Sequence, residues 1–386
     1  MRVLMLSQTL PPENRTGAPL QAVFLSRALV KLGVDVEILT TRTKGEGWEQ
    51  NHPNGIKIHT LPFANALGPG KAIRFAGAAI KALGLRGWDV LHGHALSPMV
   101  LGVALARERP ALPMLVKPSI GGPHPEGEIS RIIDSPAASI LRRAMQRIDR
   151  FAVLDELILA DLGRLSIPND RLVRVDNGVD IERFRPARPG EKREIRTRLG
   201  ITGRKVVLFC GQLTARKGIP ELLMAWSGLR AGHSDTVLAI AGDGPLEAEV
   251  REAVAASGGN IAYLGQHADI APVIRMSDLL ILPSRFESFG NVMVEALASG
   301  VPIAATPCGA ASKIVVRGKS GWLIEDTRVG SIQRTLAEAL ADSGPCSGLG
   351  VECRRIAEGF AFERIAHRYL EIYQSMLSMR SGRSAR

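Results

Sequence analysis

The sequence predicts an α/β protein made of two doubly wound, parallel-sheet domains. Three observations support this fold class. The chain has 386 residues, which is more than a single domain usually holds. Short apolar runs alternate with helix-length amphipathic segments along almost all of it, the pattern that builds a parallel sheet covered on both faces. This alternation stops once, in a charged stretch rich in turn residues, and then resumes.

The first half contains six short apolar runs that we interpret as strands, with helical patterns between them. The strands are expected at residues 3–7, 34–39, 56–61, 90–92, 114–117 and 151–154. The clearest helical patterns are residues 20–32, 96–108 and 129–147. Together these segments predict the first domain.

The rhythm breaks at residues 176–189, where Asn-Gly, two prolines and many charges cluster, and we place the domain boundary there. Strands are expected again at residues 205–210, 236–241, 261–264, 279–282 and 302–305. The expected domains are residues 1–180 and 181–364. Residues 365–386 are expected to comprise a helix that returns to the N-terminal domain and a disordered basic tail from Arg380.

Composition excludes several classes of protein. No apolar segment reaches the ~18 residues that span a bilayer, and the first seven residues read as a strand rather than a signal peptide. Four cysteines without metal-ligand spacing fit a cytosolic protein with free thiols. The net charge of +11 fits either a solvated surface or attraction to anionic partners. Because aromatic residues make up only 4% and no nucleic-acid motif is present, we expect no nucleic-acid partner.

Residues 283–302 carry the most informative pattern. A buried strand is expected to end in a turn, and an amphipathic helix begins near Asn291. Glu287 lies in the turn and Glu295 lies one helical turn further in, so both carboxylates can face the same cleft. The helix N-terminus between them offers backbone N–H groups and a positive dipole, which suits a phosphate. A surface helix with two ordinary glutamates is the alternative, but the flanking Ser-Phe-Gly and Ala-Ser-Gly-Val-Pro favour a nucleotide-sugar site.

Other turns of the second half also follow strands and contain glycine. The turn that begins at Gly211 carries Arg216 and Lys217, which suit bidentate phosphate contact and a mobile positive charge, respectively. The Gly-Asp-Gly-Pro turn at residues 242–245 is interpreted as architecture of the cleft. Gly265 ends the next strand, where backbone groups could hydrogen-bond the edge of a base.

The motifs of the second half, taken in the order in which they follow along the chain, resemble those of the retaining glycosyltransferases of family GT4. The order is N-G-V-D-x3-F, G-x4-R-K-G, G-D-G-P, L-G and P-S-x2-E-S-F-G-x4-E-A-x-A-x-G-x-P, within residues 172–325. The resemblance extends more loosely over the whole chain. It implies the GT-B fold, in which two Rossmann-like domains face each other across a cleft and a C-terminal helix returns to the N-terminal domain.

The resemblance also implies a reaction. A hexose-type sugar passes from a nucleoside-diphosphate donor to a hydroxyl acceptor, with the anomeric configuration retained and without a metal or other cofactor. Glu287 is expected to meet the donor-sugar hydroxyls, Lys217 the phosphates and Glu295 the ribose diol. The expected donor-binding residues are Gly17, Gly211, Arg216, Lys217, Gly265, Glu287, Ser288, Phe289, Gly290, Asn291 and Glu295.

Four residues of the N-terminal half complete the expected site. Gly17, in the loop after the first strand, is expected to let the backbone approach the donor's β-phosphate and the acceptor. His124 is the candidate for the histidine that the family often places near the reacting face of the donor sugar, so the catalytic candidates are Glu287, Lys217 and His124. His94 and Glu128 are candidate acceptor contacts. Either histidine can equally be a structural or surface group.

This chain departs from the family pattern in three places. Gln212 stands where the family often has arginine, Lys313 stands where an acid is usual, and only Gly17 is available where two glycines are common. The departures at Gln212 and Lys313 keep open a non-catalytic sugar-nucleotide-binding relative. A nucleotide-sugar epimerase of the same fold is the other alternative, although E-x7-E with Lys217 favours transfer. A nicotinamide dehydrogenase is disfavoured because no G-x-G-x-x-G follows Ser7.

The sequence does not identify the donor base, the sugar, the linkage or the oligomeric state. The acceptor is expected to be a glycan, a lipid-linked sugar or a small molecule. We expect a cytoplasmic protein. Weak amphipathicity at residues 141–150 leaves peripheral contact with the inner face of the membrane as an option.

Overall fold

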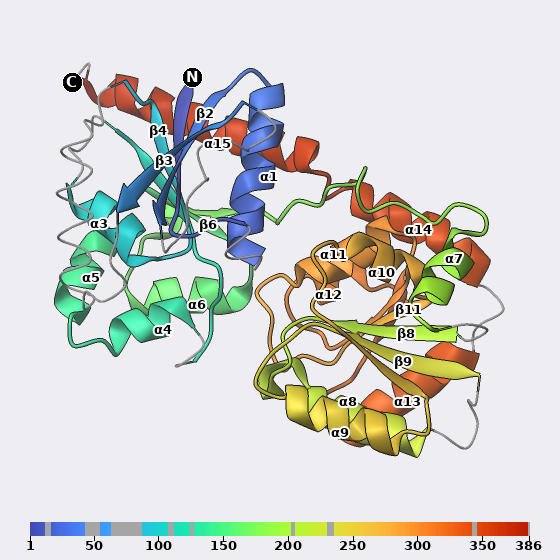
Figure 1. The fold of residues 1–386 in the computed structure, drawn as a ribbon. Coiled ribbons are helices and arrows are strands. Elements are labelled where there is room, and N and C mark those ends of the chain that lie inside the picture. The colour runs from blue at the N-terminus through green and yellow to red at the C-terminus, as the bar shows by residue number, and fades with distance from the viewer. Residues whose placement is uncertain are drawn as a thin grey trace. The chain divides into compact units, whose positions relative to one another are not determined.

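A computed structural model describes residues 1–11, 17–42, 55–62, 87–106, 112–123, 127–201, 205–229, 235–341 and 346–384. The chain forms two compact units (Figure 1). The first contains Met1–Gly178 together with Phe362–Arg386, and the second contains Val179–Ala361. Each unit is built on one parallel sheet, so the prediction of two doubly wound α/β domains is confirmed.

The first unit has a seven-stranded sheet in the order β3-β2-β1-β4-β5-β6-β7. The order reverses between β1 and β4, and sheets of this kind bind ligands at the carboxyl ends of the strands beside such a switch point. The strands are β1 (Arg2–Ser7), β2 (Asp35–Arg42), β3 (Lys57–Pro62), β4 (Val90–His94), β5 (Met114–Lys117), β6 (Arg150–Val153) and β7 (Leu172–Arg174). The short β7 was not predicted.

Helices of the first unit confirm most of the expected pattern and correct one part of it. They are α1 (Gly17–Lys31), α3 (Pro98–Ala106), α4 (Glu128–Ile133), α5 (Ala138–Gln146), α6 (Glu156–Arg164) and α15 (Phe362–Ser384), with a 3-10 turn, η2 (Asn169–Arg171). The prediction of one helix over residues 129–147 is wrong, because the chain breaks between α4 and α5. Pro136 lies in this break, and proline disfavours helical geometry at the residue before it.

The C-terminal helix α15 belongs to the first unit, as predicted. It packs against α1 (Figure 1) and adds Tyr369, Tyr373 and Met376 to a core that also contains residues of β1, β2, β4 and β5. The helix is described as far as Ser384, whereas we expected a disordered tail from Arg380. No helix among the described residues has the length and apolar character needed to cross a membrane.

The second unit has a six-stranded sheet in the order β10-β9-β8-β11-β12-β13. Its strands are β8 (Lys205–Cys210), β9 (Thr236–Ala241), β10 (Ile261–Gly265), β11 (Leu279–Leu282), β12 (Ile303–Ala305) and β13 (Gly321–Leu323). Its helices are α7 (Glu191–Arg198), η3 (Ala215–Lys217), α8 (Ile219–Gly228), α9 (Glu247–Ala256), α10 (Ala271–Met276), α11 (Asn291–Ala298), α12 (Ala311–Ile314), α13 (Val329–Ala341) and α14 (Cys346–Glu358). All five predicted strands are present, and the three-residue β13 is additional.

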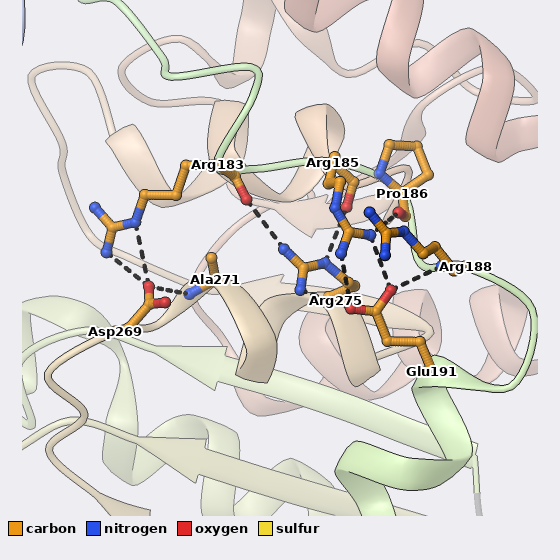
Figure 2. Close-up of polar contacts among 8 residues, drawn as sticks. All are labelled: Arg183, Arg185, Pro186, Arg188, Glu191, Asp269, Ala271 and Arg275. Atoms are coloured by element: carbon orange, nitrogen blue, oxygen red, sulfur yellow. Dashed lines mark hydrogen bonds and ion pairs between the residues drawn. The ribbon is translucent and has the colours of Figure 1, made fainter.

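The arginine-rich segment that opens the second unit is held by polar contacts (Figure 2). Arg275 of α10 donates to the carbonyl oxygens of Arg183, at 3.0 Å, and Arg185, at 3.3 Å. Arg275 and Arg185 both form ion pairs with Glu191. The hydrogen bond from Arg185, with smaller contributions from other contacts, lowers the pKa of Glu191 to about 2. Part of the basic excess in the sequence therefore fixes this segment on α7 and α10.

Candidate functional site

The turn between β11 and α11 has the predicted strand–turn–helix form. Gly290 occupies the N-cap position of α11 with a φ of +77°, a conformation that suits glycine because it has no Cβ. Ser288 and Phe289, just before it, are buried. The turn therefore brings the backbone of residues 288–291 to the N-terminus of an eight-residue helix, where an anion is favoured.

Glu287 lies in this turn and is 7% exposed. Its Oε1 accepts a hydrogen bond from Ser284 Oγ at 2.8 Å and forms an ion pair with Lys217 Nζ. The Arg216 guanidinium lies 3.9 Å from its Oε2. A carboxylate and two cations, all largely removed from solvent, therefore meet at the carboxyl ends of β8 and β11. Glu287 and Lys217, both candidate donor contacts, lie together here, and their contacts with a donor remain a prediction.

Close packing of two turns produces this cluster. Gly218, directly after Lys217, has a φ of +74°, and a Cβ built on it would lie 2.2 Å from the carbonyl oxygen of Pro283. Two hydrogen bonds join the same turns, from Arg285 N to Arg216 O at 2.8 Å and from Arg216 Nη1 to Phe286 O at 3.1 Å. The glycine after the Arg-Lys pair is therefore required for Lys217 to reach Glu287.

A third turn, which contains Gly309, packs against Glu287 and the backbone of Phe289. Gly309 has a φ of +58°, and a Cβ there would lie 2.7 Å from Phe289 O and 3.0 Å from Glu287 Cβ. The backbone N–H of Ala310 donates to Phe289 O at 2.9 Å. Lys313, the residue that departs from the family pattern, is exposed within α12.

Glu295 lies in the second turn of α11, as predicted. Burial raises its pKa to about 7, and the charge of Arg183 partly opposes this rise. Part of its surface remains accessible. The Glu295 charge also acts on the Cys210 thiol, whose pKa is raised to about 12, mainly by burial. Glu295 therefore faces the carboxyl end of β8, and near neutral pH its carboxyl group exists in both protonation states.

Glycines line the adjacent strand ends. Gly211 N donates to Ala241 O at 3.0 Å, and Gly242 N donates to Gly265 O at 2.8 Å. A Cβ on Gly211 would lie 4.0 Å from Lys217 Nζ, whereas Gly265 has no atom near its Cβ position. The predicted donor residues of the second unit thus gather along the carboxyl ends of β8, β10 and β11. Gln212, beside them, is exposed. Ser284, which hydrogen-bonds Glu287, was not singled out, although it belongs to the P-S-x2-E motif.

The candidates of the first unit have different surroundings. Gly17 is the first residue of α1, and His124 lies outside the described residues. Glu128 is buried and accepts hydrogen bonds from Leu96 N at 3.2 Å, Ser119 N at 2.9 Å and Ser119 Oγ. Burial raises its pKa, and these hydrogen bonds oppose that shift. Glu128 therefore ties together the loops that follow β4 and β5, and its contact with an acceptor remains a prediction.

His94 is the last residue of β4 and is buried. Its ring stacks on that of His92, with 4.4 Å between the centroids, and neither of its ring nitrogens has a hydrogen-bond partner among the described residues. Burial, with smaller contributions from His92 and Lys117, lowers the pKa of His94 well below its usual value. Sequence reasoning missed Lys117, whose only signal was a lysine at the end of an apolar strand.

Both halves of the chain match family profiles. Residues 191–355 match the family described as glycosyl transferases group 1, and residues 16–178 match the glycosyl transferase 4-like domain. The chain is 26% identical to glycogen synthase of Mycobacterium tuberculosis, in an alignment that covers 97% of this chain and 94% of that protein. It is 28% identical to the D-inositol 3-phosphate glycosyltransferase of Xylanimonas cellulosilytica, with 99% and 98% covered.

The fold is similar to that of solved structures. HepE of Anabaena, solved in complex with UDP-glucose, superposes with a TM-score of 0.76 at 18% identity, covering 97% of this chain and 100% of that one. At this identity the comparison shows the fold alone. The two sheets, the returning helix α15 and the two family profiles agree with one another, and the chain is therefore a glycosyltransferase of the GT4 family with the GT-B fold.

Proposed function

We propose that this glycosyltransferase moves a hexose-type sugar from a nucleoside-diphosphate donor to a hydroxyl acceptor, with retention of configuration and without a metal. The observation that carries the proposal is the cluster of Glu287, Lys217 and Arg216 beside the N-terminus of α11. The structural similarity to HepE, solved with UDP-glucose, supports a nucleotide-sugar donor.

Charge is the main energetic problem of this reaction. The diphosphate leaves as an anion while the sugar carbon gains positive character, so the site must stabilise negative charge on the leaving group. Lys217, Arg216 and the positive end of α11 would supply this stabilisation, in the place that a metal ion takes in other enzymes. Before the donor binds, Glu287 holds Lys217 through the ion pair, so the ammonium is already positioned.

Each carboxylate then has a separate role. Glu287 would accept hydrogen bonds from the donor-sugar hydroxyls, and Glu295 would accept them from the ribose diol. A carboxylate is the form that accepts two hydroxyl donors, so donor binding would lower the pKa of Glu295 from about 7. Retention by front-face displacement, with His124 as the third catalytic candidate, completes the proposal.

Transfer with a panel of UDP-, GDP-, ADP- and dTDP-sugars tests this function, in the presence and absence of EDTA. Lys217→Met should lower turnover about 100-fold or more, the usual effect of losing one charge-stabilising group. Lys319→Met, which removes an exposed lysine of the same unit, is the matched control. Unchanged turnover in the Lys217 variant would overturn the proposed role, and loss of turnover with EDTA would overturn metal independence.

Three further measurements separate the alternatives. The anomeric configuration of the product, measured by NMR, distinguishes retention from inversion. Conversion of the nucleotide-sugar in the absence of any acceptor would identify an epimerase instead. Donor binding by calorimetry without any turnover would point to a non-catalytic relative.

A further inference from the structure

Three polar residues occupy neighbouring positions at the carboxyl edge of the first sheet. Ser7 of β1 is in register with His94 of β4, and His94 is in register with Lys117 of β5. Residues in register on parallel strands point to the same face of a sheet. These residues therefore form one polar row, next to the switch point between β1 and β4. All three side chains are buried, with 1–3% of their surface exposed.

Among the described residues, two of the three side chains in this row, His94 and Lys117, have polar groups without partners, whereas Ser7 Oγ already donates to Thr9 O at 2.8 Å. Lys117 Nζ donates one hydrogen bond, to Asn177 Oδ1 at 2.7 Å, and has no ion pair within the described residues. Both ring nitrogens of His94 and the Nε2 of His92 lack partners in the same part of the chain. Proteins pair nearly all buried polar atoms, and a buried ammonium without a counter-charge is costly. Burial accordingly lowers the pKa of Lys117 to about 7.

The carboxylates nearby do not neutralise Lys117. Glu128 already accepts hydrogen bonds from Leu96 and Ser119 on both of its oxygens. The charge of Asp176 acts on Tyr369, whose pKa burial raises. The Tyr373 hydroxyl is hydrogen-bonded to His92 Nδ1 at 2.7 Å. Among the described residues, these groups from β4, α4, α15 and the segment after β7 form no ion pair with the Lys117 ammonium.

We propose that His94 and Lys117 form a subsite for an anionic group, a phosphate or a carboxylate, carried by the acceptor. This inference rests on the proposed function, because it names the class of acceptor for that transfer. Oxygen atoms of the anion would accept hydrogen bonds from the Lys117 ammonium and from an N–H of His94, which satisfies atoms that are otherwise unpaired.

Entry of an anion requires a local opening, because the row is enclosed. Ala95, directly after His94, has a φ of +67°, which is strained for a residue with a Cβ. Its N–H donates to Lys117 O at 2.9 Å, so this strained residue connects the ends of β4 and β5. The opening that the anion needs is expected here, because a change of backbone conformation at Ala95 would relieve the strain.

Calorimetric titration of the full chain with sulfate tests the subsite, because the charge of sulfate is constant above pH 3. The Lys217→Met background weakens competing anion binding at the diphosphate site, where Arg216 and the N-terminus of α11 remain, so all variants are compared in this background. Sulfate affinity should fall about tenfold between pH 6 and pH 8, because Lys117, with a pKa of about 7, loses its proton over this range. Lys117→Met should abolish sulfate binding, Lys117→Arg should retain part of it, and Lys319→Met should leave it unchanged.

Phosphate and acetate titrations at pH 6 distinguish a tetrahedral from a planar anion. If Lys117→Met fails to fold, His94→Phe serves as the second variant and should weaken sulfate binding at least tenfold. Sulfate affinity that is independent of pH, or equal in the Lys117 variant and its background, would overturn the subsite.

Donor binding in the wild-type protein separates the two proposals. If a nucleotide-sugar binds while the sulfate results are negative, the proposed function stands and the subsite is refuted. If sulfate binding depends on Lys117 but no nucleotide-sugar binds or reacts, an anion site remains, while its assignment to an acceptor and the proposed function are both refuted.

Discussion

Replacing Gly218 with alanine tests whether contact between two turns builds the donor site. The new Cβ would lie 2.2 Å from Pro283 O, about 1 Å closer than carbon and oxygen atoms pack. That oxygen belongs to the backbone, so the turns themselves have to separate. Gly318→Ala is a matched control, because Gly318 has almost the same φ, +76° against +74°, and no atom within 4 Å of the Cβ position.

The two variants should differ in stability by the energy of the clash alone. A left-handed alanine costs about 1–2 kcal/mol, of which about 0.4–1 kcal/mol is offset by the lower entropy of the unfolded chain. The Gly318 variant should therefore lose about 1 kcal/mol. Overpacking adds about 1–3 kcal/mol at Gly218, for a total of about 2–4 kcal/mol. For a unit of this size these values correspond to roughly 2–4 °C and 5–15 °C in the melting temperature, respectively.

Differential scanning calorimetry measures the melting temperatures, and nucleotide-sugar binding below both of them measures the site. Binding should weaken strongly in the Gly218 variant, because Lys217 moves with the turn, and should be normal in the Gly318 variant. Equal melting temperatures and equal affinities in the two variants would show that the turns do not meet as described.

Further predictions concern pH and the helix α15. Nucleotide-sugar affinity should rise between pH 6 and pH 8, by up to about tenfold per pH unit below the pKa of Glu295, because the carboxylate is the form that accepts hydrogen bonds. In Glu295→Gln, calorimetry should find an affinity that does not change with pH. The same pH dependence in this variant as in the wild type would contradict the role of Glu295. Burial holds the pKa values of His92 and His94 well below 6.5, so the unfolded chain takes up their protons first as the pH falls. The contribution of these histidines to the free energy of unfolding should therefore drop below pH 6.5, by up to about 1.4 kcal/mol per pH unit for each. The raised pKa of Glu295 acts in the opposite sense over the same range, so urea denaturation at pH 7.5 and 5.5 compares the wild type with His94→Phe, in which the loss should be smaller. Tyr373→Phe should destabilise the first unit by about 1–2 kcal/mol because it removes the partner of His92 Nδ1. Tyr369→Phe, which removes a buried hydroxyl that has no partner among the described residues, should be neutral or stabilising; equal losses in urea denaturation of the two variants would argue against the hydrogen bond.

Local patterns explain why much of the fold could be predicted. Central strands such as β8 and β11 are short apolar runs between glycine- or proline-containing turns, and these signals lie within a few residues of each other. The break between α4 and α5 was missed because the amphipathic pattern continues on both sides of Pro136, which hides the effect of one proline. The three-residue strands β7 and β13 have no periodicity to detect.

The candidate site also contains some residues that the sequence could predict and others that it could not. Glu287, Lys217 and the start of α11 could be predicted because the residue types and their spacing are local and specific. Contacts between distant residues could not, since nothing in a single sequence links Lys117 with Asn177, 60 positions away, or His92 with Tyr373, 281 positions away. The charge on the segment that opens the second unit was also ambiguous, because its partners Glu191 and Asp269 become apparent only in three dimensions.

The return of α15 to the first unit has a consequence for biosynthesis. Residues 1–178 leave the ribosome first, but the helix that supplies Tyr369, Tyr373 and Met376 to their core is made last. At about 5–20 residues per second, the delay is roughly 10–40 s. During this time the nascent first unit lacks the cover for part of its apolar surface, whereas the second unit is continuous in sequence and can fold as soon as it emerges. The first unit therefore begins to emerge before the second but is completed after it.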